Sequence, residues 1–237
     1  MQLEEMTVIV PTRNEMRNIT AFLRSLPSSM GLIVVDASTD DTPNVVMRTR
    51  PHNTVVLRDP GNVTQARQLG AEAAHSPWLL FSDADVTFAS EYFELVATYG
   101  DCDALYGPKL SADGYQHYYH LFSLGQHISH NLGITAASGS NMLVRRDVFW
   151  RVGGFDLRLN CNEDSELIWR VKRSGYRVCF APDLRVYARD HRRLERGRLR
   201  KTVHSVLRCA LLYSGLMPER WRGSDWGYWS AKRQAAE

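Results

Sequence analysis

Residues 77–86 read PWLLFSDADV, an apolar run that ends in two aspartates one residue apart. A strand of a parallel sheet is buried on both faces and therefore reads as a continuous apolar run. Ligands of open α/β sheets bind at the carboxyl ends of such strands, which is where Asp83 and Asp85 fall. The stretch predicts a buried strand that delivers two carboxylates to a ligand site.

Three further apolar runs precede this one and alternate with segments of helical periodicity. The expected strands cover residues 6–11, 32–36, 54–59 and 78–82. After the first strand, helical spacing is kept by Ile19, Phe22, Leu23 and Leu26. The alternation predicts an α/β fold with a doubly wound, mostly parallel sheet and helices on both faces.

The length and composition favour a single α/β domain. With 237 residues, 44% of them hydrophobic, the chain can bury one full core, and no linker divides it. No window reaches the roughly 18 apolar residues that span a bilayer, and the N-terminus lacks a signal-peptide pattern. We therefore expect a cytoplasmic protein, free or at the inner face of the cell membrane. A net charge of +3 is too small to indicate a nucleic-acid partner.

The four cysteines show no pairing pattern. Cys102, Cys161, Cys179 and Cys209 are scattered without a CxxC spacing, so neither a zinc ribbon nor a disulfide framework is indicated. For a cytosolic chain the expectation is four reduced thiols.

Carboxylates follow several of the expected strands. The first strand is followed by Arg13 and Glu15, the second ends at Asp36, and the fourth precedes Asp83 and Asp85. Carboxylates that meet at one edge of a sheet repel one another unless a cation offsets their charge. Mg²⁺ or Mn²⁺ takes such oxygen ligands and completes its shell with substrate phosphates. This pattern predicts a metal-bound nucleotide diphosphate, although aspartate after a strand is also common in turns and helix caps.

Other phosphate-binding folds lack their signatures here. Neither GxGxxG nor GxxxxGK[ST] occurs, which disfavours dinucleotide oxidoreductases and P-loop enzymes. A sugar nucleotidyltransferase would carry a glycine-rich, basic loop after the first strand, where this chain has PTRNEMRN.

Six segments in order resemble the family 2 glycosyltransferases of the GT-A fold. They are TVIVPTRNE, LIVVDASTDDT, ARQLGAEAA, LLFSDADV, GSNMLVRRDVFWRVGGFD and NEDSELIWRVKRSGYRV, and they cover roughly residues 6–188. The resemblance implies a GT-A catalytic domain over residues 1–190. Its Rossmann-like nucleotide-sugar half would span residues 1–110 and its acceptor half residues 111–190, followed by a basic helical extension over residues 191–237.

The resemblance implies a nucleotide pocket built from the first half of the chain. Pro11, Arg13 and Glu15 would line it, Asp36 would contact the base or ribose, and Arg67 would be the basic residue near the nucleotide. The usual DDGS after the second strand is here DAS, one residue shorter, which leaves the contacts of Asp36 open.

The resemblance also implies a metal site and a catalytic base. Asp83 and Asp85 match the DxD motif, with Asp85 as the direct metal ligand and Asp83 nearer the ribose. Asp164 matches the base of the ED motif, and His191 lies where related enzymes carry a late metal-binding histidine. The alternative for Asp164 is that it and Glu163 only stabilise a helix N-terminus.

The function that the resemblance implies is inverting, metal-dependent transfer of a single hexose from a nucleotide-diphosphate sugar. The acceptor would be a hydroxyl or a lipid phosphate such as a polyprenyl phosphate. The QxxRW motif and the membrane spans of processive synthases are missing, which favours transfer of one sugar. Two alternatives stay open: a sugar nucleotidyltransferase and a non-catalytic nucleotide-sugar-binding protein.

The histidines and the C-terminal segment suggest contact surfaces. His117, His120, His127 and His130 lack the carboxylate partner of zinc motifs, so we expect a helix or ordered loop over the acceptor side. Residues 185–208 hold nine Arg or Lys against two acidic residues. Helical spacing is kept by Val203, Val206, Leu207, Ala210 and Leu211, with Arg200, Lys201, His204 and Arg208 opposite. This pattern suits peripheral contact with an anionic membrane, or a packed helix with a solvated basic face, or a homodimer contact.

Overall fold

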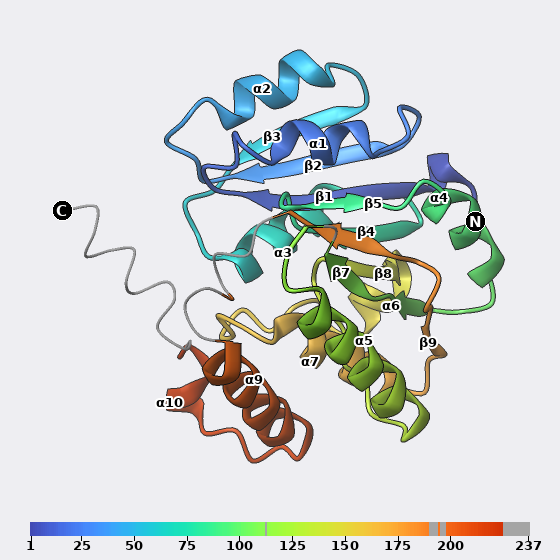
Figure 1. Cartoon of the computed structure of the whole chain (residues 1–237), viewed down its shortest axis with the longest axis vertical. Coiled ribbons are helices and arrows are strands. Elements are labelled where there is room, and N and C mark those ends of the chain that lie inside the picture. Colours follow the sequence, from blue (N-terminus) through green and yellow to red (C-terminus); the bar gives the residue numbers. More distant parts are fainter. Residues whose placement is uncertain (112, 190–193, 195–197, 225–237) are drawn as a thin grey trace.

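The computed structural model describes residues 1–111, 113–189, 194 and 198–224. A seven-stranded sheet forms its centre, in the order β3-β2-β1-β4-β8-β6-β9 (Figure 1). The strands are β1 (Met6–Thr12), β2 (Gly31–Asp36), β3 (Thr54–Arg58), β4 (Trp78–Ser82), β6 (Ala104–Tyr106), β8 (Asn141–Arg145) and β9 (Val178–Phe180). All four strands expected in the first half of the chain are present.

The sheet is mostly parallel and doubly wound, as the alternation of segments predicted. β1 pairs in parallel with both β2 and β4, β2 pairs in parallel with β3, and β6 with β9. β8 runs antiparallel to β4 and β6. Because β1 lies between β2 and β4, the polar residues after these three strands meet at one edge of the sheet.

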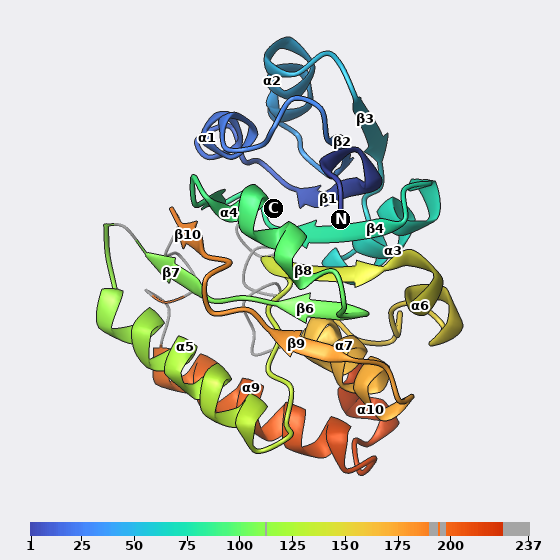
Figure 2. The same ribbon diagram turned by 90° about the vertical axis from the view of Figure 1, so that its right-hand side faces the viewer.

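Helices cover both faces of the sheet (Figure 2). On one face Val8 and Val10 of β1 pack in a cluster with α1 (Ile19–Arg24), α2 (Thr42–Thr49) and α4 (Tyr92–Leu95). On the other face Ile9 packs with α3 (Val63–Ala73), α6 (Arg146–Arg151) and α7 (Glu163–Arg173). Successive residues of a strand point to opposite faces, so the unbroken apolar runs are explained by burial on both sides.

The chain after β4 adds a small sheet and two long helices. The small sheet has the order β5 (Val86–Phe88), β10 (Val186–Ala188) and β7 (Lys109–Ser111). Helix α5 (Gln116–Asn131) carries the four histidines, and α9 (Arg198–Tyr213) and α10 (Glu219–Arg222) follow β10 in the chain. Figures 1 and 2 both place α9 beside α5 and α7. Two short 3₁₀ turns, Leu3–Glu5 and Val96–Tyr99, complete the described elements.

The expectation of four reduced cysteines is wrong. Cys102 and Cys179 form a disulfide, with their Cα atoms 6.1 Å apart. Cys179 lies in β9, and Leu105 of β6 is its register partner, so the parallel pairing of two short strands brings the sulfurs together. The two residues are 77 positions apart, and no local spacing signals such a pair. Cys161 and Cys209 are not part of a disulfide.

Helix α9 exposes apolar side chains and buries a basic one. Val206 and Leu207 are 62% and 59% exposed, whereas Arg208 is only 4% exposed. The Arg208 guanidinium donates to the carbonyls of Trp221 and Arg222, which explains how a basic side chain can be buried there. At Arg208 the expected solvated basic face is therefore not found, and the membrane, packed-helix and homodimer interpretations of the segment stay predictions. Along the described ranges, no helix combines the length and the apolar character that crossing a bilayer requires.

Candidate active site

Asp36 ends β2 inside a saturated hydrogen-bond network. Its Oδ1 accepts from Thr12 Oγ1 and Ser38 Oγ, both at 2.7 Å, and its Oδ2 accepts from the Ser38 amide at 3.1 Å. The guanidinium of Arg58, at the end of β3, also pairs with Oδ2. The Asp36 side chain is 0% exposed, while that of Arg58 is 61% exposed. The contact expected between Asp36 and a base or ribose would require this network to open, and Arg58 is the exposed group at that position.

The loop after β1 is locked to the loop after β2. Asn14 adopts a left-handed backbone with φ of 57°, and its Oδ1 accepts from the Thr39 amide at 2.9 Å. The Glu15 amide donates to Thr42 Oγ1 at 3.0 Å. Pro11 is half-buried at the end of β1, Glu15 is half-buried and Arg13 is exposed. These predicted pocket residues thus lie on a rigid pair of loops beside Asp36.

The two aspartates after β4 face a lysine that the sequence did not single out. Lys109 Nζ, from β7, lies 3.3 Å from Asp85 Oδ1 and 3.9 Å from Asp83 Oδ2. It also donates to Ser140 Oγ at 3.1 Å, and Ser140 in turn donates to Asp83 Oδ2. Both carboxylates are therefore held at the sheet edge by groups that come later in the chain.

Arg67 joins the aspartate pair to the ED motif. Helix α3 begins at Val63 because Asn62 caps it: the Asn62 side chain accepts from the Gln65 amide at 2.9 Å. The second turn then directs Arg67 inward, where Nη2 pairs with Asp83 Oδ1 at 2.7 Å and Nη1 pairs with Glu163. The Arg67 side chain is only 4% exposed. One buried cation thus connects residues that lie 16 and 96 positions away.

Asp164 lies at the start of α7, next to this bridge of Asp83, Arg67 and Glu163. Its Oδ2 accepts from the Gly139 amide and its Oδ1 from the Ser165 amide, both at 2.6 Å. Gly139 approaches Arg67 so closely that a Cβ there would lie 2.4 Å from the guanidinium carbon. The residue before α7 is Asn162, which makes no side-chain cap bond, and Glu163 points to Arg67 instead. Asp164 is therefore oriented by two amides beside the bridge.

Glu163 has an unusual protonation equilibrium. Burial, together with the negative charge of Asp164, raises the pKa of Glu163 to about 7, and the nearby Arg67 offsets this only in part. A buried carboxyl is costly to ionise because the low dielectric disfavours its charged form. The net charge of the bridge therefore changes near neutral pH, as Glu163 gains or loses its proton.

Asp83 and Asp85 fit a hard divalent cation that is shared with substrate phosphates. Within the described ranges, His, Cys, Asp and Glu form no cluster of three or more suited to a metal. Asp83 and Asp85 are 19% and 22% exposed, so their oxygens remain accessible from the sheet edge. Magnesium is commonly held by one or two carboxylates together with substrate phosphates, and this donor set matches that pattern. His191, the other predicted metal ligand, lies outside the described residues.

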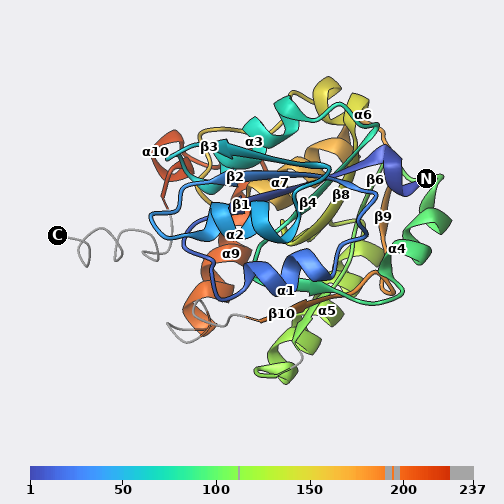
Figure 3. The same ribbon diagram turned by 90° about the horizontal axis from the view of Figure 1, so that it is seen from above.

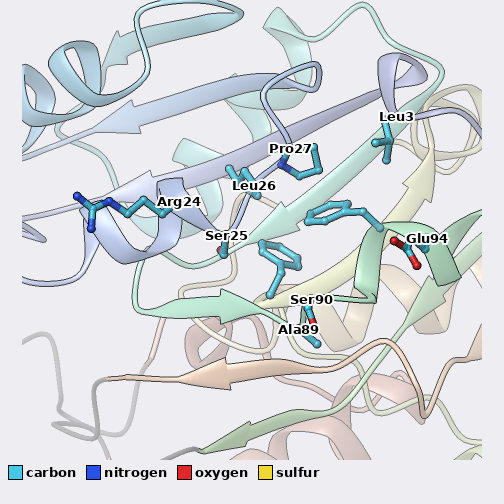
Figure 4. Close-up of a pocket in the computed structure, with 10 residues that line it drawn as sticks. Leu3, Arg24, Ser25, Leu26, Pro27, Ala89, Ser90 and Glu94 are labelled. Atoms are coloured by element: carbon cyan, nitrogen blue, oxygen red, sulfur yellow. The ribbon is translucent and has the colours of Figure 1, made fainter.

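A cavity of about 480 Å³ lies elsewhere in the molecule. Figure 4 shows its lining, which comes from the start of the chain, the end of α1 and the segment between β5 and α4. The connection from α1 leads into the amino end of β2, away from the carboxyl edge where Asp36 lies. Seen from above, α1 and α4 cover one side of the sheet (Figure 3). None of the predicted site residues lines this cavity.

Sequence reasoning missed three groups of this site. Lys109, Gly139 and Ser140 come from short segments that carry no motif by themselves. Gly139 and Ser140 are, however, the first two residues of the quoted segment GSNMLVRRDVFWRVGGFD, so their position in a matched segment was the available signal. For Lys109 the sequence offers none.

Comparison with known proteins places the chain in a family. The family described as glycosyl transferase family 2 matches residues 7–153. Succinoglycan biosynthesis protein ExoA of Rhizobium meliloti is 27% identical over 197 residues, which are 72% of this chain and 59% of ExoA. The pre-mycofactocin glycosyltransferase of Mycobacterium tuberculosis is 26% identical over 204 residues, 79% of this chain and 43% of that protein. The chain thus spans about half the length of these curated relatives.

Solved structures agree on the fold. S. aureus TarS 1–349 in complex with UDP-GlcNAc aligns with a TM-score of 0.66 at 20% identity, over 98% of this chain and 76% of that one. The mannosyltransferase PcManGT from Pyrobaculum calidifontis, in complex with GDP-Man and Mn²⁺, aligns with a TM-score of 0.66 at 19% identity, over the same shares. Since the family match covers more than half of the 237 residues, this chain belongs to glycosyl transferase family 2, and its fold is of the GT-A type.

Proposed function

We propose that this chain transfers a single hexose, with inversion, from a nucleotide-diphosphate sugar to an acceptor. The observation that carries the proposal is the buried bridge from Asp83 through Arg67 to Glu163, with Asp164 beside it. The bridge connects the aspartate pair, which suits a diphosphate with its bound metal ion, to the segment that carries Asp164, a carboxylate suited to general base catalysis. UDP-GlcNAc and GDP-Man in two structural neighbours support the donor class.

The donor diphosphate would be held at Asp83 and Asp85. In this proposal Asp85 binds Mg²⁺ or Mn²⁺ directly, and Asp83, which Arg67 and Ser140 already orient, lies nearer the ribose. A bound divalent cation supplies Lewis-acid stabilisation of charge on the diphosphate leaving group. The Mn²⁺ in the PcManGT structure supports this choice of cofactor. Pro11, Arg13 and Glu15 line the nucleotide side, and Arg58 supplies an exposed guanidinium there.

Asp164 would act as the general base. A carboxylate oxygen of Asp164 takes the proton of an acceptor hydroxyl as that oxygen attacks the anomeric carbon from the face opposite the diphosphate. The amides of Gly139 and Ser165 hold the carboxylate in one orientation, so the base is already in position when the acceptor arrives. If the acceptor is a polyprenyl phosphate, its oxygen is already ionised and the base contributes less.

Helices α5 and α9 suit contact with an anionic lipid surface. They lie side by side, and Tyr118 Oη is 3.3 Å from Thr202 Oγ1. Large apolar side chains on and next to them are more than half exposed: Leu121 (69%), Leu124 (54%), Leu132 (73%), Val206 (62%), Leu207 (59%) and Leu216 (71%). Neither helix contains an Asp or Glu, while the sequence of α9 contains Arg198, Arg200 and Lys201. In a twofold dimer the basic helix α9 would face its own copy, whereas an anionic membrane complements both the charge of α9 and the apolar surface of the two helices. This contact would place the enzyme at the inner face of the cell membrane, next to a lipid-linked acceptor.

The alternatives differ in their products. A sugar nucleotidyltransferase would release pyrophosphate from a nucleoside triphosphate, and a non-catalytic binding protein would leave a nucleotide sugar intact. The proposed transferase releases a nucleoside diphosphate. Product analysis of the purified chain with Mn²⁺, given a nucleotide sugar in one reaction and a nucleoside triphosphate with a sugar phosphate in another, therefore separates the three.

A thermal-shift screen of UDP- and GDP-sugars, with and without Mn²⁺, tests the proposal most broadly. A ligand at 100 times its dissociation constant stabilises a protein by about 2.7 kcal/mol, which is a measurable shift in melting temperature. We expect one nucleotide class to raise the melting temperature only when Mn²⁺ is present, and Asp85→Ala to lose that metal-dependent shift. An equal shift in Asp85→Ala would contradict the assignment of the metal site.

A further inference from the structure

Lys109 lies against both aspartates that follow β4, of which Asp85 is the one assigned to the metal. Its ammonium nitrogen lies 3.3 Å from Asp85 Oδ1 and 3.9 Å from Asp83 Oδ2, and it donates to Ser140 Oγ at 3.1 Å. The Lys109 side chain is only 15% exposed. The lysine is thus part of the site and not a surface residue near it.

The backbone fixes this lysine in place. Lys109 opens β7, and its register partner in β10 is Val186. The preceding carbonyl, of Pro108, accepts from the Val186 amide at 3.2 Å and from Asn141 Nδ2 at 3.3 Å. Asn141 follows Ser140 directly and starts β8, so the lysine and its serine partner are held by the same framework. The ammonium therefore cannot leave the carboxylates through a movement of the chain without breaking these contacts.

The ammonium and a divalent cation compete for the same oxygens. A metal that binds Asp85 without a diphosphate gains the carboxylate but meets the positive charge of Lys109 at close range, and like charges repel. A nucleotide diphosphate changes this balance, because its phosphate oxygens can accept from Lys109 and coordinate the metal at the same time.

We propose that Lys109 couples metal binding to donor binding: it opposes the metal in the free enzyme and contributes its charge to the diphosphate once both are bound. The inference rests on the proposed donor and metal site. Lys109 would weaken the binding of the metal alone and strengthen the binding of metal and nucleotide together. It would therefore raise the factor by which the nucleotide increases the affinity for the metal, and, because coupling is reciprocal, the metal would increase the affinity for the nucleotide by the same factor. The metal then enters this site mainly together with the nucleotide.

The test measures Mn²⁺ binding by electron paramagnetic resonance, with and without UDP or GDP, whichever nucleotide stabilises the protein in the thermal-shift screen. For Lys109→Met we expect Mn²⁺ alone to bind about 5- to 10-fold more tightly than to the wild type. We also expect the factor by which the nucleotide tightens Mn²⁺ to fall about tenfold, within the usual range of coupling between sites. Lys109→Arg keeps the charge and should keep most of the coupling.

Lys172→Met is the matched control. Lys172 Nζ donates to the carbonyl of Gly133 at 2.9 Å, away from the aspartate pair, so its loss should leave Mn²⁺ affinity and coupling unchanged. Melting temperatures of the variants show whether each is folded, and Lys109→Arg provides a conservative second variant. If Lys109→Met binds Mn²⁺ alone as weakly as the wild type and keeps the same coupling, the inference is wrong while the proposed site stands. If the wild type binds neither Mn²⁺ nor nucleotide, the proposed function and this inference both fail.

Discussion

Arg67 and Glu163 form a buried ion pair that ties helix α3 to the first residue of α7. Arg67 also pairs with Asp83, so a single guanidinium positions both ends of the site. The site is therefore part of the structural core, and mutations at this bridge should affect stability and activity together.

Loss of Arg67 should destabilise the fold strongly. Arg67→Met leaves Glu163 and Asp83 without their buried cation, and removal of one partner of a buried pair typically costs about 3–5 kcal/mol. Equilibrium urea unfolding measures the change. Arg48→Met is the control, because Arg48 pairs with Asp41 at an exposed position where a pair is worth about 1 kcal/mol or less. Equal unfolding free energies for the two variants would show that the bridge does not stabilise the fold.

A methyl group at position 139 should disturb the same bridge. The Cβ of Gly139→Ala would lie 2.4 Å from the Arg67 guanidinium, so either that side chain or the loop has to move. Overpacking of this kind costs about 1–3 kcal/mol, and the shift would also lengthen the hydrogen bond that the Gly139 amide donates to Asp164.

Gly125→Ala serves as the comparison for that variant. Nothing lies within 4 Å of a Cβ built at Gly125, which is an exposed helical position where alanine is the better residue. We expect Gly125→Ala to melt at or above the wild-type temperature and Gly139→Ala to melt below it. The reverse order would contradict the close approach of Gly139 to Arg67.

Protonation of Glu163 should make stability depend on pH. Because burial raises the pKa of Glu163 to about 7 from an ordinary value of 4.5, the folded chain holds a proton in this window that the unfolded chain has lost. This contribution to stability is complete below pH 4.5 and declines as the pH rises to about 7, by at most about 1.4 kcal/mol per pH unit. Urea unfolding at several pH values should give a shallower decline for Glu163→Gln. Parallel curves for the variant and the wild type would exclude Glu163 as the titrating group.

The exposed apolar face of α9 leads to a prediction about lipid binding. Val206→Glu together with Leu207→Glu adds two negative charges to that face and should abolish co-sedimentation with vesicles that contain phosphatidylglycerol. Val55→Glu, on the exposed edge strand β3, is the control and should bind as the wild type does. If the wild type does not bind these vesicles at low salt, the proposed membrane contact is wrong.

The sequence predicted the strands well because both faces of the sheet are covered. Every residue of a run such as WLLFS is then buried, and a continuous apolar run is a signal that survives without any tertiary information. The edge where Asp36, Asp83 and Asp85 meet followed from the strand order alone.

The contacts that complete the site depended on tertiary structure. Lys109 reaches Asp85 only because β7 joins β10, and Cys102 reaches Cys179 only because β6 pairs with β9. These strands have three residues each, too few to show a period. Helix α9 shows a different limit of sequence analysis. Its periodicity predicted an apolar and a basic face, but the sequence did not indicate that the carbonyls of Trp221 and Arg222 would bind Arg208 in a buried position.

The most direct measurement for the proposed mechanism is the turnover of Asp164→Asn. With the nucleotide sugar and metal identified by thermal shift, release of the nucleoside diphosphate can be followed with water as the acceptor. The account predicts that the variant still shows the metal-dependent thermal shift of the wild type but turns over about 100-fold or more slowly, the usual worth of a general base. Turnover within a few-fold of the wild type would contradict the assignment of Asp164 as the base.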